Sequence, residues 1–541
     1  MNDFTRAARW WRDETIYQIY PRSFCDRSGD GVGDLAGIRA HLPYLRELGV
    51  DALWLSPIFV SPMRDFGYDI ADYRAIDPLF GTMADFDRLL EEAHGCGLKL
   101  LLDLVPNHTS DQHPWFKASR SSRDDPRRDW YIWKDPVRGS DGSHHPPNNW
   151  ISNFGGSAWE WDEATGQYYY HAFLASQPDL NWRNPDVRAA MFDVMRFWLD
   201  KGVDGFRVDV IWHLIKDDQF RDNPPNPAYS PDEPEIHRTL QVHSADQPEI
   251  HRVIAQMREV MHEYDERLLI GEIYLPLERL MHYYGEEGTG VHLPFNFQLI
   301  QCPWRAERVA EIVDEYEAAL PPGGWPNWVL SNHDQPRIAA RTGERQAAIA
   351  AMLLLTLRGT PTIYYGDELA IADVAIPPDR VQDPWARQEP GTSFNRDRAR
   401  TPMQWSAEPH AGFSVVEPWL PLTDDWPDRN VAAQRGRPGS LLSLYTALLR
   451  LRRSHAVLRT GAYRRIEAGE DIFAYERGEG ADRLAILLNF AAQPRTASLP
   501  DAYRGGAILL SSDPARSGAA EGPFRLGADE GVIVAPAGGN R

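Results

Sequence analysis

The chain has 541 residues, too many for one compact domain and enough for a large barrel with smaller attached parts. Its hydrophobic fraction of 43% and charged fraction of 25% are those of a folded globular protein and exclude global disorder. The 78 acidic residues outnumber the 57 basic ones, which gives a net charge of −21 at pH 7. Such a charge disfavours nucleic acid and anionic lipid as partners. Aromatic residues make up 11% of the chain and include 19 Trp, more than a core needs.

Eight short apolar runs recur along the chain, and each is typical of a β-strand. These runs are Ile16–Tyr20, Ala52–Ser56, Lys99–Val105, Gly205–Val210, Leu268–Ile273, Leu293–Phe297, Trp328–Ser331 and Thr362–Tyr365. Amphipathic helices are predicted between several of them, over Leu35–Leu48, Met83–Cys96, Pro185–Lys201 and Ile250–Glu266. Eight strands that alternate with helices predict a parallel sheet closed into a (β/α)8 TIM barrel, with an open doubly wound sheet as the less favoured alternative.

Two further regions are predicted outside the barrel. Residues 107–179 are rich in Trp, Asn, Gly and Pro and are too long for an ordinary loop, which predicts a small domain inserted after the third strand. Short alternating strands beyond residue 460 predict a C-terminal antiparallel β domain, after a last helix at Leu441–Arg453. We therefore expect the barrel over residues 1–106 and 180–460, the inserted domain over 107–179 and the β domain over 461–541. A second irregular stretch, 217–247, predicts another loop on the rim of the barrel.

The sequence predicts a cytoplasmic protein without a membrane anchor. Its three cysteines, Cys25, Cys96 and Cys302, are too far apart for a disulfide framework or a zinc site. The first residues carry charges throughout and contain no apolar stretch typical of a signal peptide. Every apolar run is shorter than the roughly 18 residues that a membrane-spanning helix needs.

Polar residues follow the predicted strands at the points where they end. The third strand leads into His108, the fourth ends with Arg207 and Asp209, the fifth with Glu272, and the seventh leads into His333 and Asp334. Barrel enzymes carry their chemistry at the C-terminal ends of the strands. Buried acids are costly there unless they are paired or take part in a reaction, although a single Asp can equally serve as a strand-end cap or an ion pair.

Two of these acids have the pattern of a glycosidase pair. Arg207 and Asp209 are two residues apart on one strand, so their side chains share a face, and we expect Arg207 to keep Asp209 ionised. Glu272, in a drier position one strand away, would hold a raised pKa and act as a general acid. Two carboxyl groups whose pKa values are pushed apart are what glycoside hydrolysis needs. Asp334 could bind hydroxyl groups of a distorted sugar ring.

The motifs DLVPNH, GFRVD, GEIY and SNHD resemble, in order and spacing, the signature regions of the α-amylase family of glycoside hydrolases. QPDLN at residues 177–181 and RTPMQW at residues 400–405 are similar to the oligo-1,6-glucosidase and α-glucosidase branch of that family. The resemblance covers nearly the whole chain from IYQIYPRSF onward, including the inserted domain and the terminal β domain.

The resemblance implies a role for each acid. Asp209 matches the nucleophile that forms a covalent glucosyl–enzyme, Glu272 the acid/base, and Asp334 the transition-state stabiliser. The implied mechanism retains the anomeric configuration, with carboxyl groups about 5–5.5 Å apart.

The same resemblance implies a set of substrate-binding residues, namely Asp65, Tyr68, His108, Phe154, Phe173, Gln177, Arg207, His333 and Arg396. Among them Asp65 matches an acid that grips the non-reducing glucose, and Arg396 matches its salt-bridge partner, with Arg400 as the alternative. A pair that closes one end of the pocket leaves room for one terminal glucose and so implies exo-action.

The predicted function is an exo-acting, retaining α-glucosidase that hydrolyses small α-glucosides and can transfer glucose to acceptors, as a monomer or a homodimer. The alternatives are an oligo-1,6-glucosidase, a sucrose isomerase or a trehalose synthase on the same scaffold. Val210, directly after the nucleophile, favours α-1,6 or mixed action, since this branch tends to have Thr or Ala there in α-1,4-acting enzymes. A non-catalytic sugar-binding subunit is a distant alternative.

An acidic segment near the N-terminus predicts a cation loop. Asp26, Ser28, Asp30, Val32 (through its carbonyl) and Asp34 alternate around a Gly bend, as in an EF-hand loop. Matching loops of the family hold a structural Ca²⁺ or sometimes Mg²⁺, and a solvated acidic turn is the alternative.

The glycines of this segment also fit a dinucleotide-binding pattern, Gly31-Val-Gly33-Asp-Leu-Ala36, which would make the protein an oxidoreductase. The surrounding acids argue against a pyrophosphate there. A histidine cluster that includes His237, His243 and His251 lacks acids or cysteines at metal-ligand spacing and is interpreted as solvated loop.

Overall fold

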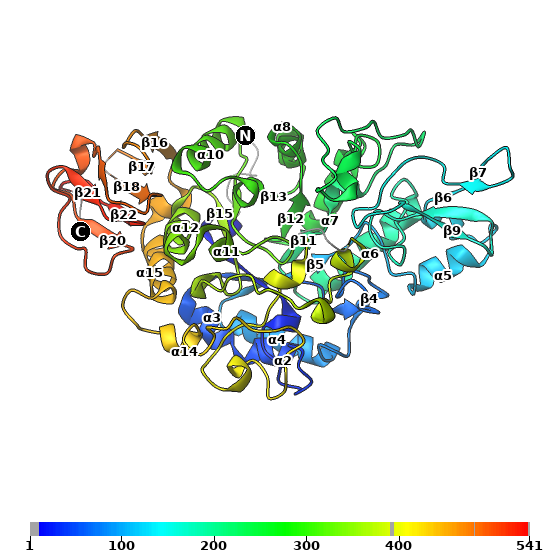
Figure 1. The fold of residues 1–541 in the computed structure, drawn as a ribbon, viewed down its shortest axis with the longest axis horizontal. Coiled ribbons are helices and arrows are strands. Elements are labelled where there is room, and N and C mark those ends of the chain that lie inside the picture. The colour runs from blue at the N-terminus through cyan, green and yellow to red at the C-terminus, as the bar shows by residue number, and fades with distance from the viewer. Residues whose placement is uncertain (1–9, 390–393, 481, 539–541) are drawn as a thin grey trace.

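The core of the molecule is a closed eight-stranded parallel barrel (Figure 1). The computed structural model describes residues 10–389, 394–480 and 482–538. The barrel strands are β1 (Ile16–Ile19), β2 (Ala52–Leu55), β5 (Lys99–Leu104), β11 (Gly205–Val208), β12 (Leu268–Ile273), β13 (Leu293–Asn296), β14 (Asn327–Val329) and β15 (Thr360–Tyr364). They pair in chain order, and β15 closes on β1. The predicted fold class is confirmed, and each strand lies within two residues of its predicted run.

The register of the barrel places the charged residues beside one another. Arg207 on β11 lies opposite Asp103 on β5 and Ile270 on β12. The strands approach closely at Gly205, where a Cβ would lie 2.1 Å from the carbonyl oxygen of Leu268. Only glycine allows this approach, so the start of β11 depends on that residue.

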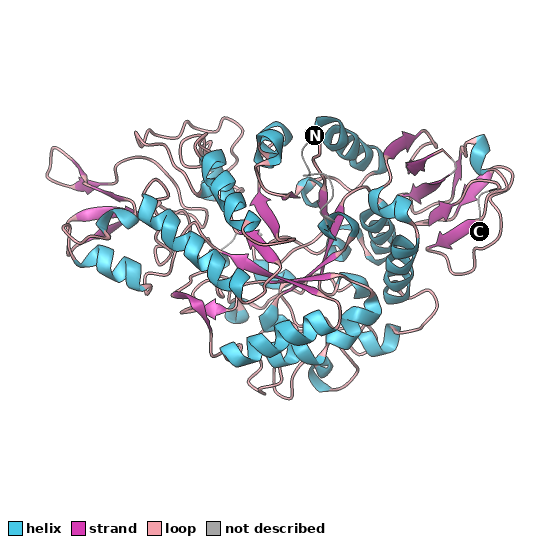
Figure 2. Cartoon of the chain, turned by 180° about the vertical axis from the view of Figure 1, so that it is seen from behind, coloured by secondary structure: helices cyan, strands magenta, loops and turns pink. Residues whose placement is uncertain are grey.

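Helices surround the barrel as an outer layer (Figure 2). They include α4 (Met83–Gly95), α6 (Pro185–Asp200), α7 (Ile250–His262), α10 (Ala306–Ala319), α12 (Glu344–Thr356) and α15 (Leu441–Ser454). The single helix predicted over Leu35–Leu48 is two helices, α2 (Leu35–Ala40) and α3 (Leu42–Leu48). Pro43 lies in the first turn of α3 and has no N–H to continue the hydrogen bonding of α2, so the helix restarts there.

The segment between β5 and α6 forms a small unit of its own, drawn in cyan in Figure 1. It contains α5 (Pro114–Ser121) and a three-stranded sheet of β6 (Trp133–Lys134), β10 (Gln167–Tyr170) and β9 (Trp159–Asp162). Trp150, Trp159 and Tyr170 form its core. A buried ion pair between Lys216 and Asp179 ties it to the 217–247 region.

The C-terminal part is an antiparallel sheet at the other end of the molecule (Figure 1). Its five strands are β16 (Tyr463–Ile466), β17 (Ile472–Glu479), β18 (Asp482–Asn489), β22 (Gly531–Val534) and β20 (Ile508–Ser511). The sheet packs on α10, α12 and α16 (Ala456–Thr460). Within the three described ranges, no helix combines the length and apolarity needed to cross a membrane. Cys25, Cys96 and Cys302 are all free thiols.

Candidate active site

A cavity of about 760 Å³ opens at the C-terminal ends of the barrel strands. Three acids line it: Asp209 directly follows β11, Glu272 lies near the end of β12, and Asp334 follows β14. The lining also includes the predicted Asp65, Tyr68, His108, Phe154, Phe173 and Arg396. The other predicted residues, Gln177, Arg207 and His333, are fully buried and contact the side chains that line the cavity.

Arg207 joins the two acids of the predicted pair. Its Nη1 donates to Asp209 Oδ1 at 2.6 Å, and its Nη2 lies 2.7 Å from Glu272 Oε2. Nη1 also lies 3.3 Å from Asp103 Oδ1. The Val210 backbone N–H donates to Glu272 Oε2 at 2.9 Å. One guanidinium therefore spans both carboxyl groups and fixes their spacing.

The electrostatics assign one proton to this pair. Burial raises the pKa of Glu272 well above its usual value, even though Arg207 opposes the shift. Burial also raises the pKa of Asp209, while Arg207 and a hydrogen bond from Glu272 lower it. The expectation that Arg207 alone keeps Asp209 ionised is too simple, because Arg207 shares its charge among three carboxyl groups. The greater rise in pKa belongs to Glu272, so Glu272 carries the proton and Asp209 the charge.

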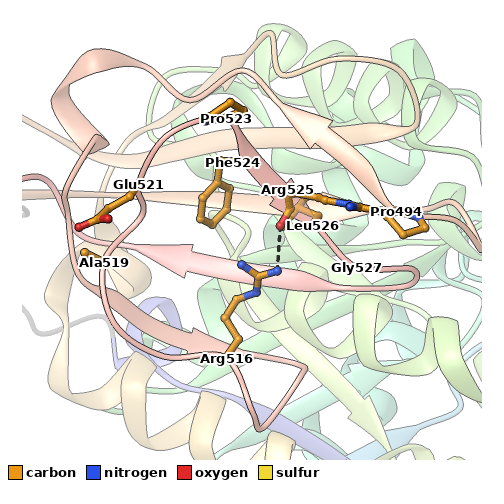
Figure 3. Close-up of a pocket in the computed structure, with 9 residues that line it drawn as sticks. All are labelled: Pro494, Arg516, Ala519, Glu521, Pro523, Phe524, Arg525, Leu526 and Gly527. Atoms are coloured by element: carbon orange, nitrogen blue, oxygen red, sulfur yellow. Dashed lines mark hydrogen bonds between the residues drawn. The ribbon is translucent and has the colours of Figure 1, made fainter.

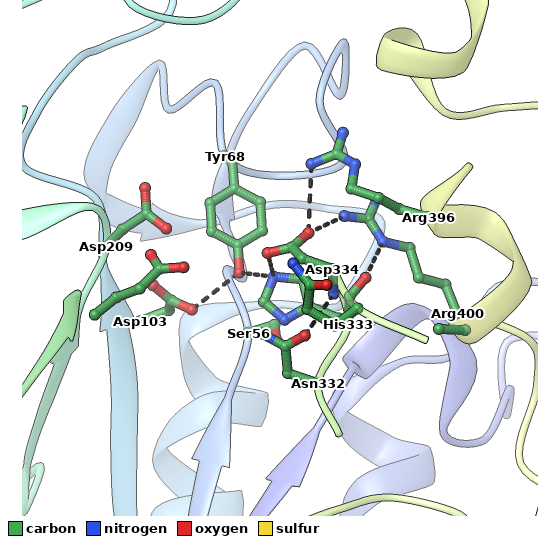
Figure 4. A network of polar contacts seen from close by, with 12 residues as sticks. Ser56, Tyr68, Asp103, Asp209, Asn332, His333, Asp334, Arg396 and Arg400 are labelled. Carbon is green, nitrogen blue, oxygen red and sulfur yellow. Dashed lines mark hydrogen bonds and ion pairs between the residues drawn. The ribbon is translucent and has the colours of Figure 1, made fainter. Parts of the chain in front are cut away.

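Asp334 is held as an anion (Figure 4). Its carboxylate accepts from Arg400 Nη2 at 2.7 Å and lies 3.1 Å from His333 Nε2 and 3.4 Å from Arg396 Nη1. Burial alone would raise the pKa of Asp334, but His333 and the two arginines hold it well below its ordinary value. Asp334 can therefore face a developing positive charge.

A second buried ion pair lies in the lining of the cavity. Arg396 Nη2 donates to Asp65 Oδ1 at 2.8 Å, and Arg396 also bonds Asp383 Oδ1 at 2.8 and 3.0 Å. Gln177 Nε2 donates to Asp65 Oδ2 at 3.2 Å. Of the two candidate arginines, Arg396 contacts Asp65, whereas Arg400 contacts Asp334. Asp383 was not anticipated from the sequence.

Both predicted histidines are neutral in this setting. Burial lowers the pKa of His108 to about 4 and that of His333 to about 3. His108 Nε2 lies 3.1 Å from the Tyr68 carbonyl oxygen, and its ring centroid lies 5.2 Å from that of Phe173. Neutral imidazoles can each donate one N–H to a neutral hydroxyl group.

Aromatic side chains form much of the remaining wall. Phe154 contacts Phe173 edge-on at 5.7 Å and stacks on Trp385 at 5.4 Å between ring centroids. Several lining residues were not predicted from the sequence, among them Trp212, Tyr274, Gln335, Trp385 and Phe394. Trp212 and Tyr274 follow Asp209 and Glu272 by three and two residues, so their nearness to strand ends was a usable signal. Aromatic faces suit the C–H faces of sugars.

Three loops meet at the mouth of the cavity through two acids. Glu389 accepts hydrogen bonds from Trp385 Nε1 at 2.7 Å and from the Glu235 backbone N–H at 2.9 Å. Glu235 in turn accepts from the Gly156 backbone N–H at 2.9 Å. The inserted domain, the 217–247 loop and the segment around Trp385 are thereby joined.

The predicted cation loop is held by hydrogen bonds to its own backbone. Asp26 accepts from the N–H groups of Gly29 and Gly31 at 2.7 and 2.8 Å, and Asp34 caps α2 by accepting from Gly37 N–H at 2.6 Å. Within residues 10–389, 394–480 and 482–538, no three His, Cys, Asp or Glu side chains are placed to hold a metal ion, the 237–251 histidines included. The carboxylates of Asp26, Asp30 and Asp34 thus do not converge as a group of three, and the cation site stays a prediction.

A second hollow, of about 460 Å³, lies on the C-terminal sheet (Figure 3). Arg516 donates there to the Arg525 carbonyl oxygen at 2.8 Å and pairs with Glu530. Glu521 is the single acid among the described residues that line it. It lacks the paired carboxyl groups of the barrel cavity.

A parallel barrel whose strand ends bring two buried carboxyl groups and a third acid into one cavity defines a glycoside hydrolase. Residues 18–461 match the family model described as alpha amylase, catalytic domain. This match spans most of the chain, and the protein belongs to the α-amylase family.

Curated relatives extend over nearly the whole chain. A probable alpha-glucosidase of Rhizobium meliloti is 42% identical over 508 residues, covering 91% of each chain. An oligo-1,6-glucosidase of Parageobacillus thermoglucosidasius is 39% identical over 551 residues, covering 93% of this chain and 94% of that one.

Solved structures share the complete fold. An alpha-glucosyl transfer enzyme, XgtA, superposes with a TM-score of 0.91 at 40% identity, covering 97% of this chain and 99% of that one. The trehalulose synthase MutB of Pseudomonas mesoacidophila superposes with a TM-score of 0.89 at 36% identity, covering 98% of this chain and all of that one. Glucosidases, an alpha-glucosyl transfer enzyme and a trehalulose synthase are thus all named among the proteins that this chain resembles.

Proposed function

We propose that the protein is an exo-acting, retaining α-glucosidase that removes terminal glucose from small, neutral α-glucosides. The observation that carries the proposal is the Arg207 guanidinium, which hydrogen-bonds Asp209 and forms an ion pair with Glu272. It supports a close spacing of the two carboxyl groups, which is typical of retaining enzymes, whereas inverting enzymes separate them by about 6.5–9.5 Å.

The reaction takes place in two steps. In the first, the Asp209 carboxylate attacks C1 of the glucose, the bond from C1 to the glycosidic oxygen breaks, and Glu272 gives its proton to that oxygen. In the second, Glu272 takes a proton from water, the water oxygen bonds to C1, and the bond from C1 to Asp209 breaks. Asp334, kept ionised by its cationic neighbours, stabilises the positive charge on the sugar ring in both transition states.

The Asp65–Arg396 pair supports exo-action. The pair is buried in the lining of the cavity, and Asp383 accepts a second hydrogen bond from Arg396. A carboxylate held this way can accept hydrogen bonds from hydroxyl groups of a terminal glucose but leaves no path for a longer chain. The cavity therefore fits a non-reducing end.

The lining of the cavity supports neutral substrates. Arg396 is the only Lys or Arg among the described lining residues, and it already forms ion pairs with Asp65 and Asp383. A phosphorylated sugar would need an additional cation to replace its solvation. We therefore assign the substrate class as uncharged α-glucosides.

The linkage depends on the region next to the nucleophile. Val210 has φ of 36° and ψ of 46°, a left-handed conformation that costs a β-branched residue energy, and its N–H is bonded to Glu272. Val at this position supports α-1,6 or mixed action. Sucrose isomerisation and maltose–trehalose interconversion are the competing activities. Because this chain resembles the trehalulose synthase MutB, sucrose is included among the substrates to be assayed.

One set of assays tests the proposal. Wild-type protein is incubated with maltose, isomaltose, sucrose and trehalose, and the products and their initial anomeric form are followed by NMR. Release of α-glucose as the main product supports the proposal, whereas disaccharide products from sucrose or maltose identify an isomerase and β-glucose excludes retention. Asp209→Ala and Glu272→Gln should abolish turnover while the exposed control Asp193→Ala keeps it.

We also propose a cytosolic location and a structural cation at residues 26–34, both of which rest on sequence features. The three unpaired thiols support the location, and cell fractionation tests it.

The alternating oxygen donors of the loop support the cation, although their present placement does not converge. The assembly as monomer or homodimer is tested by light scattering on the purified chain.

A further inference from the structure

His333 contacts residues at the first barrel strand. Its ring is nearly parallel to those of Tyr20, 5.7 Å away, and Tyr68, 5.3 Å away. Gln18 Nε2 lies 2.8 Å from His333 Nδ1. Gln18 and Tyr20 are two residues apart at β1, within the IYQIYPRSF motif, so they point to the same face and both contact the imidazole.

The surroundings of His333 determine which ring nitrogen carries the proton. Asp334 Oδ2 lies 3.1 Å from His333 Nε2, and an ionised carboxylate can only accept a hydrogen bond. Nε2 must therefore carry the hydrogen, and in a neutral ring Nδ1 is then an acceptor. An amide N–H can donate a hydrogen bond to Nδ1, whereas an amide oxygen would be repelled by the Nδ1 lone pair.

The neighbouring hydrogen bonds agree with this direction. Tyr68 Oη lies 2.6 Å from His333 Nε2 and donates to Asp103 Oδ2 at 3.1 Å, so the Tyr68 oxygen is free to accept from His333 (Figure 4). Burial and the charges of Arg400, Arg207 and Arg396 lower the pKa of His333, while Asp334 raises it. The ring stays neutral at pH 7, and the choice between its two tautomers remains.

We propose that Gln18 is a positioning residue that fixes His333 as its neutral Nε2–H tautomer, with that N–H directed at Tyr68 Oη and Asp334. The consequence for catalysis rests on the proposed function, whereas the tautomer does not. Tyr20 and Tyr68 hold the plane of the ring, and Gln18 sets its hydrogen bonding. The first-strand motif, which the mechanism otherwise leaves unused, thereby gains a role.

The tautomer can be measured without any substrate. The protein is labelled with ¹⁵N at histidine, and the His333 signals are identified by their loss in His333→Asn. The wild type should show a neutral ring protonated at Nε2. In Gln18→Glu a carboxylate faces Nδ1 while Asp334 faces Nε2, so both nitrogens should become protonated and the pKa of His333 should rise. Protonation at Nδ1 alone in the wild type would overturn the proposal.

Kinetics with matched variants test the consequence. Gln18→Leu keeps the volume but removes the donor, and kcat/KM for an aryl α-glucoside should fall about 10- to 100-fold. Ser56→Ala removes the other partner of Gln18, at 3.3 Å, and should keep the wild-type tautomer and rate. A folded Gln18→Leu with wild-type kcat/KM would overturn the role in catalysis. If the wild type lacks glucosidase activity yet shows the Nε2–H tautomer, the proposed function fails and the positioning by Gln18 stands.

Discussion

Replacement of Asp65 by Asn separates substrate recognition from stability. Asp65 accepts from Arg396 at one oxygen and from Gln177 at the other, and its remaining lone pairs face the cavity. Asparagine keeps the shape of the side chain but removes its charge. Arg396 retains its hydrogen bonds to Asp383 at 2.8 and 3.0 Å, so the guanidinium is not left buried without a partner.

The expected loss of activity follows from these contacts. Each hydrogen bond between a carboxylate and a sugar hydroxyl group contributes about 1.5–3 kcal/mol. Loss of two such bonds at the terminal glucose corresponds to about 3–6 kcal/mol, or a fall in kcat/KM of about 10²- to 10⁴-fold. The free energy of unfolding should fall by no more than about 2 kcal/mol, because Arg396 stays paired. Arg396→Met, in contrast, leaves the carboxylates of Asp65 and Asp383 buried without this cation. It should lower the free energy of unfolding by about 3–5 kcal/mol.

The assay compares kcat/KM for an aryl α-glucoside with urea denaturation of the same preparations. Asp111→Asn, which alters an acid paired with the exposed Arg64, serves as the control and should change neither quantity. The reasoning is refuted if Asp65→Asn keeps kcat/KM within about threefold of the wild type. It is also refuted if Asp65→Asn destabilises the protein as much as Arg396→Met does.

Three further predictions concern the acid, the linkage and the loop. Because burial raises the pKa of Glu272, this group is protonated at neutral pH, and kcat/KM should fall as the pH rises through that pKa. A pH–rate profile with a flat alkaline side would contradict its role as the acid. Val210→Thr should lower the ratio of isomaltose to maltose hydrolysis, measured as the two kcat/KM values, and an unchanged ratio would place linkage choice elsewhere. Chelation by EDTA should lower the melting temperature, with recovery on adding Ca²⁺, if residues 26–34 bind a cation; an Asp30→Ala variant that responds identically would exclude this loop.

The barrel could be predicted because each of its strands can be recognised from its own short stretch of sequence. Runs such as Leu268–Ile273 are buried on both faces and appear as continuous apolar segments, so their existence and bounds follow from the sequence. The break between α2 and α3 depends on Pro43 and was missed because apolar periodicity continues across it. Asp103 and Glu272 could be placed at the same rim because each lies near the end of such an apolar run, on the third and the fifth barrel strand.

The rest of the cavity depends on contacts between distant segments. Trp385, on the short helix α13 (Pro384–Gln388), and Phe394 line it from a part of the sequence without regular periodicity, and no spacing rule relates them to Phe154. Arg400 opens the RTPMQW motif and Arg396 lies just before it, and only the folded path shows which of them meets Asp65. The protonation of Asp209 and Glu272 likewise needs the geometry, since it depends on how three acids share Arg207.

The hydrogen bonds of Glu235 and Glu389 that join three loops at the mouth of the cavity have a consequence for dynamics. Gly156, Glu235 and Glu389 lie 79 and 154 residues apart, and hydrogen bonds between loops join them. The barrel strands exchange many more bonds, so the mouth should open in local unfolding events at a lower free energy than the barrel itself. Amide hydrogen exchange should then be faster at Glu235 than along β12. The protein would release glucose through this weakly protected rim while its acids stay fixed in the rigid part of the fold.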